Sequence, residues 1–323
     1  MTSVGRPPEF VSVGEPLVAF VATSSGPLVE VANYSTHVVG AEVNVAVGVS
    51  RLGHRASLVG RVGNDPFGTV ILRRLMAEGV RVDHLIRDPA APTALLFRNL
   101  RRFPPPEVIY RRAGCAGARL TPDDVVAAFD GLPPGTIVHL SGVTPALSES
   151  CRTATRTVME VVRTLGLDFF VDVNYRRRLW PVEEARPVLL DLVSSASIVT
   201  ASLDEAALLT GAVQAPDAVT ALLDLGPHTV VVRDGPLLAV AGTKTDRAPV
   251  VARNPIPVEP LDPVGAGDAF NAGLAAGLLR HGDLLSSLML AHQCGAAVVG
   301  VVGDIEGMPT YADLESAGGD VSR

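Results

Sequence analysis

The chain has 323 residues, 47% of them hydrophobic, which is enough for one large domain or for one domain with a small appendage. The formal net charge of −7 argues against a nucleic-acid-binding protein, and no apolar run reaches the roughly 20 residues needed to span a bilayer. Cys115, Cys151 and Cys294 have no paired spacing, so we expect neither disulfides nor a zinc site, and we expect a reducing, cytoplasmic compartment.

Lys244 is the one lysine of the chain, and it lies in the polar stretch AGTKTDR. A Schiff-base aldolase or a pyridoxal enzyme needs a desolvated lysine, and a Walker-type nucleotide site needs the sequence Gly-Lys-Ser/Thr. The sequence therefore excludes these classes of enzyme.

Short β-branched runs alternate with helical patterns along most of the chain. We expect strands over 55–63, 136–142, 168–175, 196–202 and 228–235, and helices over 65–80, 148–166, 183–195 and 203–211. This alternation predicts an α/β fold with a doubly wound, mostly parallel sheet and helices on both faces.

Two stretches without helical patterns, residues 26–39 and 92–112, interrupt this alternation. The second contains a proline-rich turn at Pro104–Pro106, as a hairpin would. We interpret the two together as a small β lid over the active site, with an ordinary surface hairpin as the alternative. The remaining chain then divides into an α/β core over 9–25, 40–91 and 113–316, and tails over 1–8 and 317–323.

Polar residues gather where the predicted strands end. They are Ser141, Gly142, Asp172, Asn174, Ser202, Arg233 and Asp234, with Asp262 further along the chain. Ligands of open α/β sheets bind outside the carboxyl ends of the strands, so this pattern is consistent with an active site there. Polar strand ends that serve solubility alone are the alternative.

The segment DPVGAGDAF, residues 262–270, combines a turn, two glycines and the start of an apolar helix. The unpaired N–H groups at a helix start carry partial positive charge, and glycines let a phosphate approach them, so Gly265, Ala266 and Gly267 can form an anion hole. Asp268 is suited to accept the proton of a hydroxyl group that attacks the phosphate. The alternative is a helix capped by Asp268 with a small-residue packing face.

DPVGAGDAFNAG resembles the C-terminal signature of the ribokinase-like (PfkB-type) carbohydrate kinases, and VVGAEVNVAVGVSRLGHRASLVGRVGNDPFG resembles their N-terminal half. The resemblance extends from about Val11 to Asp313. The segments GAEVNVA, VIYRRAGCAGARL, LSGVTPALSE, VDVNYRRRLW and GDIEGMP resemble 2-keto-3-deoxygluconate kinases in particular. The resemblance implies a ribokinase-like fold and the ATP-dependent phosphorylation of a 2-keto-3-deoxy sugar acid at its 6-hydroxyl.

The resemblance also implies the roles of individual residues. Asp268 matches the catalytic base, with Gly265, Ala266 and Gly267 as the anion hole. The positions that match substrate contacts are Gly40, Asn44, Tyr110, Arg112, Arg176 and Asp304. The positions that match the nucleotide site are Ser202, Glu205, Arg233, Gly235, Gly265, Gly267 and His292, with Glu205 holding the metal indirectly.

The resemblance implies ATP and Mg²⁺ as cofactors, leaves the need for a monovalent cation open, and implies a homodimer or higher homo-oligomer formed through the lid. Arginine binds carboxylates bidentately, so Arg112 and Arg176 favour a sugar acid as substrate. The alternative for Arg176 is a helix cap or a surface ion pair. The alternative for the basic cluster of Arg102, Arg111 and Arg112 is a solvated surface.

Four positions depart from the family pattern: Val39, Leu96, Leu238 and His292. Val39 and Leu96 fall at substrate positions, and they favour a second hypothesis, a kinase for a neutral sugar such as fructose. Leu238 and His292 fall at nucleotide positions, and they favour a third, a non-catalytic sensor of a sugar or nucleotide.

Overall fold

The computed structural model describes residues 7–100, 106–256, 258–280 and 282–318. Within these ranges, nine strands form the main sheet in the order β13-β12-β11-β10-β9-β8-β1-β4-β5. Their bounds are β1 Phe10–Val13, β4 Ala56–Gly63, β5 Leu85–Asp88, β8 Ile137–Ser141, β9 Asp168–Asp172, β10 Ile198–Ser202, β11 Thr229–Asp234, β12 Leu238–Thr243 and β13 Val250–Arg253. Only the pairings of β12 and β13 are antiparallel, which confirms the mostly parallel sheet.

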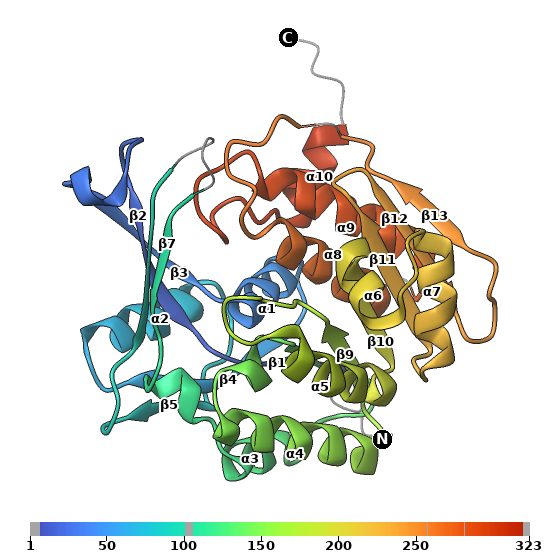
Figure 1. Ribbon diagram of the computed structural model, residues 1–323, viewed down its shortest axis with the longest axis horizontal. Helices are drawn as coiled ribbons and strands as arrows, with labels where there is room; N and C mark the ends of the chain where they lie inside the picture. Colours follow the sequence, from blue (N-terminus) through green and yellow to red (C-terminus); the bar gives the residue numbers. More distant parts are fainter. Residues whose placement is uncertain (1–6, 101–105, 257, 281, 319–323) are drawn as a thin grey trace, which may run out of the picture.

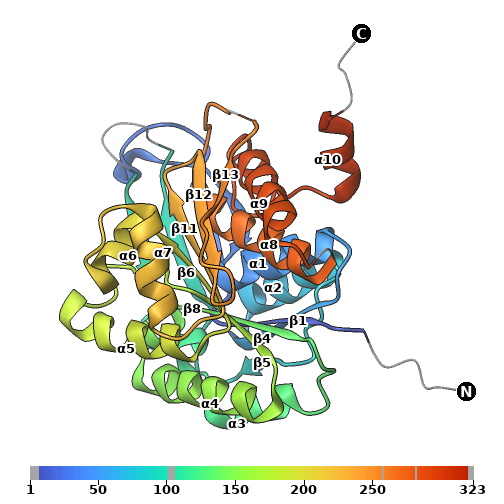
Figure 2. The ribbon, with the colours of Figure 1, turned by 90° about the vertical axis from the view of Figure 1, so that its right-hand side faces the viewer.

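Helices cover both faces of the main sheet (Figures 1 and 2). One face packs against α1 (Ala41–Arg51), α2 (Pro66–Ala77), α8 (Ala266–Arg280) and α9 (Leu284–Val298). The other packs against α3 (Pro122–Phe129), α4 (Glu149–Leu165), α5 (Val182–Ser195), α6 (Leu203–Thr210) and α7 (Ala215–Asp224). The chain closes with α10 (Tyr311–Gly318). Short 3₁₀ turns lie at Leu28–Glu30, Ala116–Arg119 and Thr144–Ala146.

Local capping chemistry sets the bounds of the predicted helices. Asp65 accepts a hydrogen bond from the Gly68 N–H at 2.8 Å, and Pro66 fills the first turn of α2, where a proline costs no hydrogen bond. Ser148 caps α4 in the same way, and Gly166 ends that helix with a left-handed φ of 64°. The helices predicted over 65–80 and 148–166 therefore form close to the expected bounds.

A second, four-stranded sheet lies beside the main body and forms the lid (Figure 1). Its order is β3-β2-β6-β7, with β2 Leu17–Ala22, β3 Tyr34–Val39, β6 Ala94–Arg98 and β7 Val108–Arg111. We expected residues 9–25 in the core, but β2 pairs with β3 and β6 in the lid. Three residues, Gly14, Glu15 and Pro16, separate β1 from β2; their glycine and proline mark a break in the strand but not a change of sheet. Arg102, Pro104 and Pro105 lie outside the described residues.

The strand order places a ligand crevice beside β1. The chain runs from β1 outward through β4 to β5, and then returns to the other side of β1 with β8. Such a reversal opens a crevice at the carboxyl ends of the two strands. Among the described residues, no single helix is long and apolar enough to span a membrane, and α6 and α7 pass that test only as a pair bent by 50°.

Candidate active site

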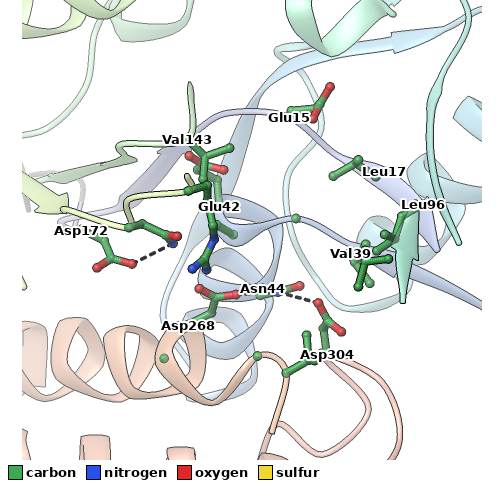
Figure 3. A pocket seen from close by; sticks show the side chains of 18 of the residues that line it. Glu15, Leu17, Val39, Glu42, Asn44, Leu96, Val143, Asp172, Asp268 and Asp304 are labelled. Atoms are coloured by element: carbon green, nitrogen blue, oxygen red, sulfur yellow. Dashed lines mark hydrogen bonds between the residues drawn. The ribbon is translucent and has the colours of Figure 1, made fainter. Parts of the chain in front are cut away.

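Two cavities meet at the start of α8. The first, about 550 Å³, lies between the lid and the carboxyl edge of the main sheet, and we call it the acceptor pocket (Figure 3). The second, about 460 Å³, lies between β11–β13 and α9, and we call it the nucleotide pocket. The two cavities share the lining residues Ser202, Arg233, Pro263 and Gly267.

The turn before α8 has the geometry of an anion hole. Gly265 has a φ of +83°, and a Cβ atom there would lie 2.8 Å from the Asp304 carbonyl oxygen. A Cβ atom on Gly267 would lie 2.6 Å from the Arg233 guanidinium. Within the described ranges, no protein acceptor bonds the backbone N–H groups of Gly265, Gly267 and Asp268. Glycine is thus required sterically at Gly265, whereas a side chain at Gly267 would displace the Arg233 guanidinium; the N–H groups without a described acceptor face an anion site flanked by this arginine.

Asp268 lies half-buried in the first turn of α8, at the floor of the acceptor pocket. Its carboxylate accepts a hydrogen bond from Asn44 Nδ2 at 2.7 Å, and in the described part of the chain it bonds no backbone N–H of its own helix. Removal from water by the surrounding protein raises the pKa of Asp268 to about 8. The capping alternative for Asp268 is therefore wrong, whereas the small-residue packing face exists: Gly273 and Gly277 lie against the backbone of α9.

Asn44 connects Asp268 to a second carboxylate, that of Asp304 (Figure 3). The same Nδ2 atom lies 3.3 Å from Asp304 Oδ2, and Asn44 Oδ1 is buried without a hydrogen-bond partner among the described residues. Burial raises the pKa of Asp304 to about 6. Three residues from distant parts of the sequence thus present oxygen and nitrogen atoms to the pocket, as recognition of sugar hydroxyls requires.

Arg112 lines the acceptor pocket, but its guanidinium is already engaged. Its Nε and terminal nitrogen both bond Glu15, the Nε at 2.8 Å, and the guanidinium lies 5.1 Å from the ring centre of Tyr110. Glu15 is 1% exposed, and burial raises its pKa to about 7. We did not predict Glu15, although it directly follows β1 at the carboxyl edge of the sheet, where a polar residue is informative.

Arg176 and Gly40 also lie where the sequence analysis placed them, on the acceptor pocket. Arg176 is exposed and has no ion-pair partner in the described part of the chain, so its fork is free for a ligand. Gly40 begins α1 with a φ of +144°, and a Cβ atom there would lie 2.5 Å from the Glu15 carbonyl oxygen. Glycine is needed at this position because a side chain would fill the space.

Val39 and Leu96 form an apolar wall of the acceptor pocket, on the side of the lid (Figure 3). Both side chains pack in one cluster with Leu17. Sequence reasoning also missed two charged residues of this pocket: Glu42, whose buried carboxylate accepts hydrogen bonds from Ser141 and Thr144, and Arg98, which lies within β6. A charged residue inside an apolar strand was the available signal for Arg98.

Oxygen atoms gather beside the anion hole at the ends of β9 and β10. Asp172 accepts bonds from Asn174 at 3.0 Å and from Arg233 at 3.2 Å. Asn174 has the left-handed φ of 38°, rare for a residue other than glycine, and in the part of the chain that the structure describes its buried Oδ1 has no hydrogen-bond partner. Glu205 accepts the N–H groups of Ser202 and Tyr175 and so ties α6 to this loop.

These residues fit Mg²⁺ held mainly by phosphates and water. Mg²⁺ takes oxygen ligands and usually keeps several waters in nucleotide sites. The unpartnered Asn174 Oδ1 and the carboxylates of Asp172 and Glu205 offer such oxygens, all on the lining of the acceptor pocket next to Gly267. In the described ranges no cluster of three or more His, Cys, Asp or Glu side chains could hold a metal by itself.

The nucleotide pocket is mostly apolar and contains the other predicted residues. Its lining includes Ala266, Gly235, Leu238 and His292. His292 lies edge-on to Phe270, with 5.3 Å between ring centres, and its Nε2 lies 3.2 Å from the Ala252 carbonyl oxygen. Burial lowers the pKa of His292, so the ring is neutral at pH 7. A flat apolar slot beside an anion hole suits a purine attached to phosphates.

Comparison with known proteins decides the family. The model of the pfkB family carbohydrate kinases matches residues 8–311. The chain belongs to the pfkB family of carbohydrate kinases. The suspected resemblance and the ribokinase-like fold are both confirmed.

Relatives within the pfkB family differ in the sugar that their names give. A 2-dehydro-3-deoxygluconokinase from Thermoproteus tenax is 34% identical over 310 residues, which cover 94% of this chain and 92% of the relative. A probable fructokinase-4 from Arabidopsis thaliana is 32% identical over 324 residues, covering 97% and 98%. The crystal structure of a fructokinase from Vibrio cholerae O395 with fructose, ADP and calcium ion matches with a TM-score of 0.83 at 26% identity, covering 95% and 98%.

Proposed function

We propose that this pfkB-family kinase transfers the γ-phosphoryl group of ATP to the 6-hydroxyl of 2-keto-3-deoxygluconate, also called 2-dehydro-3-deoxygluconate, or of a close sugar acid. The observation that carries the phosphoryl transfer is the position of Asp268. It lines the acceptor pocket next to Gly267, which lines both pockets, and beside the N–H groups of Gly265 and Gly267, which have no protein acceptor within the described ranges.

The reaction needs little covalent chemistry from the protein. The 6-hydroxyl gives its proton to Asp268, its oxygen bonds the γ-phosphorus, and the bond to the bridging oxygen breaks with the electron pair leaving on ADP. The N–H groups of Gly265 and Gly267 and the guanidinium of Arg233 stabilise the charge on the transferred group. Asn174, Asp172 and Glu205 would help to hold Mg²⁺, which would neutralise charge on the phosphates. Because Asp268 must be ionised to act, we expect kcat/KM to rise with pH, to reach half of its maximum near the pKa of about 8, and to level off above it.

The sugar-acid assignment rests on Arg176. Its guanidinium lines the acceptor pocket and has no ion-pair partner within the described ranges, so it is free to bind a carboxylate. The 2-dehydro-3-deoxygluconokinase relative supports the same substrate. We further propose a homodimer formed through the lid, where Ile109 and Tyr110 are exposed on β7, and a cytoplasmic location.

A neutral sugar such as fructose is the second candidate. The observation that favours it is the Glu15–Arg112 pair, which neutralises one of the two arginines that a sugar acid would use. Val39 and Leu96 add an apolar wall where a charged or hydroxylated substrate gains no hydrogen bond. The fructokinase relatives are nearly as similar to this chain as the sugar-acid kinase.

The test is ADP release from Mg-ATP with 2-keto-3-deoxygluconate, its C4 epimer, fructose and ribose. Asp268→Ala should lower turnover by at least about 10³-fold while circular dichroism shows an intact fold. Arg176→Ala should raise KM for the acid by about 10- to 100-fold, whereas Arg177→Ala, an exposed neighbour outside the pocket, should not. If only fructose were turned over, the proposed sugar-acid substrate would be wrong and the neutral sugar would take its place. Sugar binding without ADP release would favour the non-catalytic sensor.

A further inference from the structure

Arg98 is a buried charge in the lid with no role in the reaction described above. It ends β6, its side chain is 4% exposed, and its terminal nitrogen lies 2.5 Å from Asp262 Oδ2. The same nitrogen lies 3.8 Å from Asp304 Oδ1. Burying an arginine is costly unless its partners are close, so a solvated surface role does not explain this residue.

Asp262 connects Arg98 to the anion hole. Its Oδ1 accepts the N–H of Val264 at 3.3 Å, one residue before Gly265. Its Oδ2 accepts the N–H of Gly303 at 3.3 Å, one residue before Asp304. One carboxylate thus fixes both backbone segments that meet at Gly265, and Arg98 holds that carboxylate from the lid.

Arg98 is also connected to the proposed base, Asp268, through Asp304 and Asn44. Asp304 shares the Nδ2 atom of Asn44 with Asp268. The positive charge of Arg98 opposes the rise that burial and the neighbouring Asp262 cause in the pKa of Asp304. Without Arg98, two buried carboxylates would face each other, and Asp304 would take up a proton more readily.

We propose that Arg98 is a positioning residue for phosphoryl transfer, which joins strand β6 of the lid to the anion-hole turn through Asp262 and to Asp268 through Asp304 and Asn44. This inference rests on the proposed kinase reaction. Arg98 does not need to touch the reacting atoms: it fixes the turn that carries the free N–H groups and holds the charge of Asp304.

Substitution of Arg98 tests this role by kinetics and pH profile. Arg98→Met should lower kcat by at least about 100-fold with little change in KM for ATP, because the nucleotide pocket does not include Arg98. The pH profile of kcat/KM should also change, since Asp304, which faces Asp268 together with Arg176 and Asp172, would lose the opposing charge of Arg98. Arg98→Lys keeps the charge and should restore the pH profile.

The matched control is Arg61→Met. Arg61 also bonds two carboxylates, Asp88 and Asp124, but it lies outside both pockets, so its loss should lower Tm without changing kcat or the pH profile. If Arg98→Met misfolds, the double variant Arg98→Met/Asp262→Asn removes both charges of the pair and should fold, with kcat still low.

Three results would overturn the inference. Arg98→Met could lower Tm without changing kcat, Arg98→Met could keep the wild-type pH profile, or the double variant Arg98→Met/Asp262→Asn could have a normal kcat. Absence of turnover in the wild-type enzyme and in Arg61→Met would instead refute the kinase reaction, and the role of Arg98 with it.

Discussion

Asp268 carries an energetic cost that follows from its function. A carboxylate that takes a proton from a hydroxyl group needs an oxygen atom that does not already accept hydrogen bonds from the protein. Among the described residues, Asn44 is the one hydrogen-bond donor to the Asp268 carboxylate. Partial burial with so few donors disfavours the ionised form, which is why the pKa rises from 3.8 to about 8. Active sites commonly trade stability for reactivity in this way.

This cost predicts that Asp268→Asn stabilises the fold in a pH-dependent manner. The folded chain keeps the Asp268 proton up to about pH 8, whereas the unfolded chain loses it near pH 3.8, so Asp268 lowers stability as pH rises between these values. Asparagine does not ionise, so Asp268→Asn removes this loss of stability with rising pH. Thermal unfolding should give the variant a higher Tm than the wild type at pH 8, with the gap closing near pH 4. Equal Tm differences at both pH values would contradict the argument.

The anion hole makes a second prediction at the residue scale, for Gly265→Ala. A left-handed residue other than glycine costs about 1 kcal/mol, and at Gly265 the new Cβ atom would also press on the Asp304 carbonyl oxygen at 2.8 Å. We expect kcat to fall by about 100-fold or more because the turn must shift. ADP release and thermal unfolding would measure the two effects.

Gly211→Ala is the matched control for Gly265→Ala. Gly211 has nearly the same φ, +81°, at the end of α6, and a Cβ atom there meets nothing within 4 Å. Gly211→Ala should therefore lower Tm by less than Gly265→Ala, because backbone strain is its one cost, and should leave kcat unchanged. Equal kcat losses in both variants would show that backbone strain alone, and not the anion hole, causes the defect.

The candidate site could be predicted from the sequence where one motif holds several functional groups. Gly265, Gly267 and Asp268 are adjacent in the chain, and their chemistry is readable from local order. Glu15 and Arg98 escaped because their partners, Arg112 and Asp262, are 97 and 164 positions away. Each of these pairs forms only when the lid has folded onto the core, and a single sequence does not show which distant residues will pair.

At the scale of elements, the contact between α8 and α9 controls the nucleotide pocket. Glycines on α8 let the two backbones approach closely: a Cβ atom on Gly273 would lie 2.7 Å from the Ala291 Cα atom. Ala291 precedes His292, which lines the nucleotide pocket. The position of the His292 ring on α9 thus depends on the glycine at position 273 of α8.

Gly273→Ala should therefore push α9 away and weaken nucleotide binding. Overpacking of this kind typically costs 1–3 kcal/mol, which exceeds the gain of about 1 kcal/mol from replacing glycine by alanine in a helix. We expect a lower Tm and a KM for ATP raised by about tenfold, with KM for the sugar unchanged. Gly277→Ala, which presses on Ser287 further from the pocket, should lower Tm alone. An unchanged KM for ATP in Gly273→Ala would contradict this account.

The elements themselves were predictable to the extent that their signals are local. The strands and helices that we expected between 55 and 235 formed near their expected bounds, because capping residues and apolar periodicity lie within each segment, whereas β5, α3 and α7 were not predicted. The membership of β2 in the lid was not predictable, because LVAFVA is as apolar as a core strand and its partners β3 and β6 come later in the chain.

At the scale of the whole molecule, the strand order separates the two substrates. The acceptor pocket lies between the lid and the carboxyl edge of the sheet, and the nucleotide pocket lies at the β11–β13 end beside α9. They meet only around the start of α8, where Ser202, Arg233, Pro263 and Gly267 line both. A change at the far end of one pocket should therefore leave binding in the other pocket intact.

Leu237→Glu tests this separation. Leu237 is 51% exposed and lines the nucleotide pocket away from the shared residues, so the variant should fold normally while a charge replaces apolar contact with the base. Loss of one leucine contact corresponds to about 1.5 kcal/mol or more, and hence to a nucleotide Kd raised by about tenfold. Calorimetric titration with Mg-ADP should show this rise, and the Tm increase caused by the sugar should match that of the wild type.

Leu285→Glu controls for the charge itself, since Leu285 is also 51% exposed but lies at the start of α9, outside both pockets. It should leave the binding of both ligands unchanged. A loss of sugar binding in Leu237→Glu would mean that the two pockets are coupled, because ligand binding in one would then depend on a residue that only the other contains. None of the described lid strands lines the nucleotide pocket, so the shared turn at Pro263 and Gly267 would then be the route of the coupling.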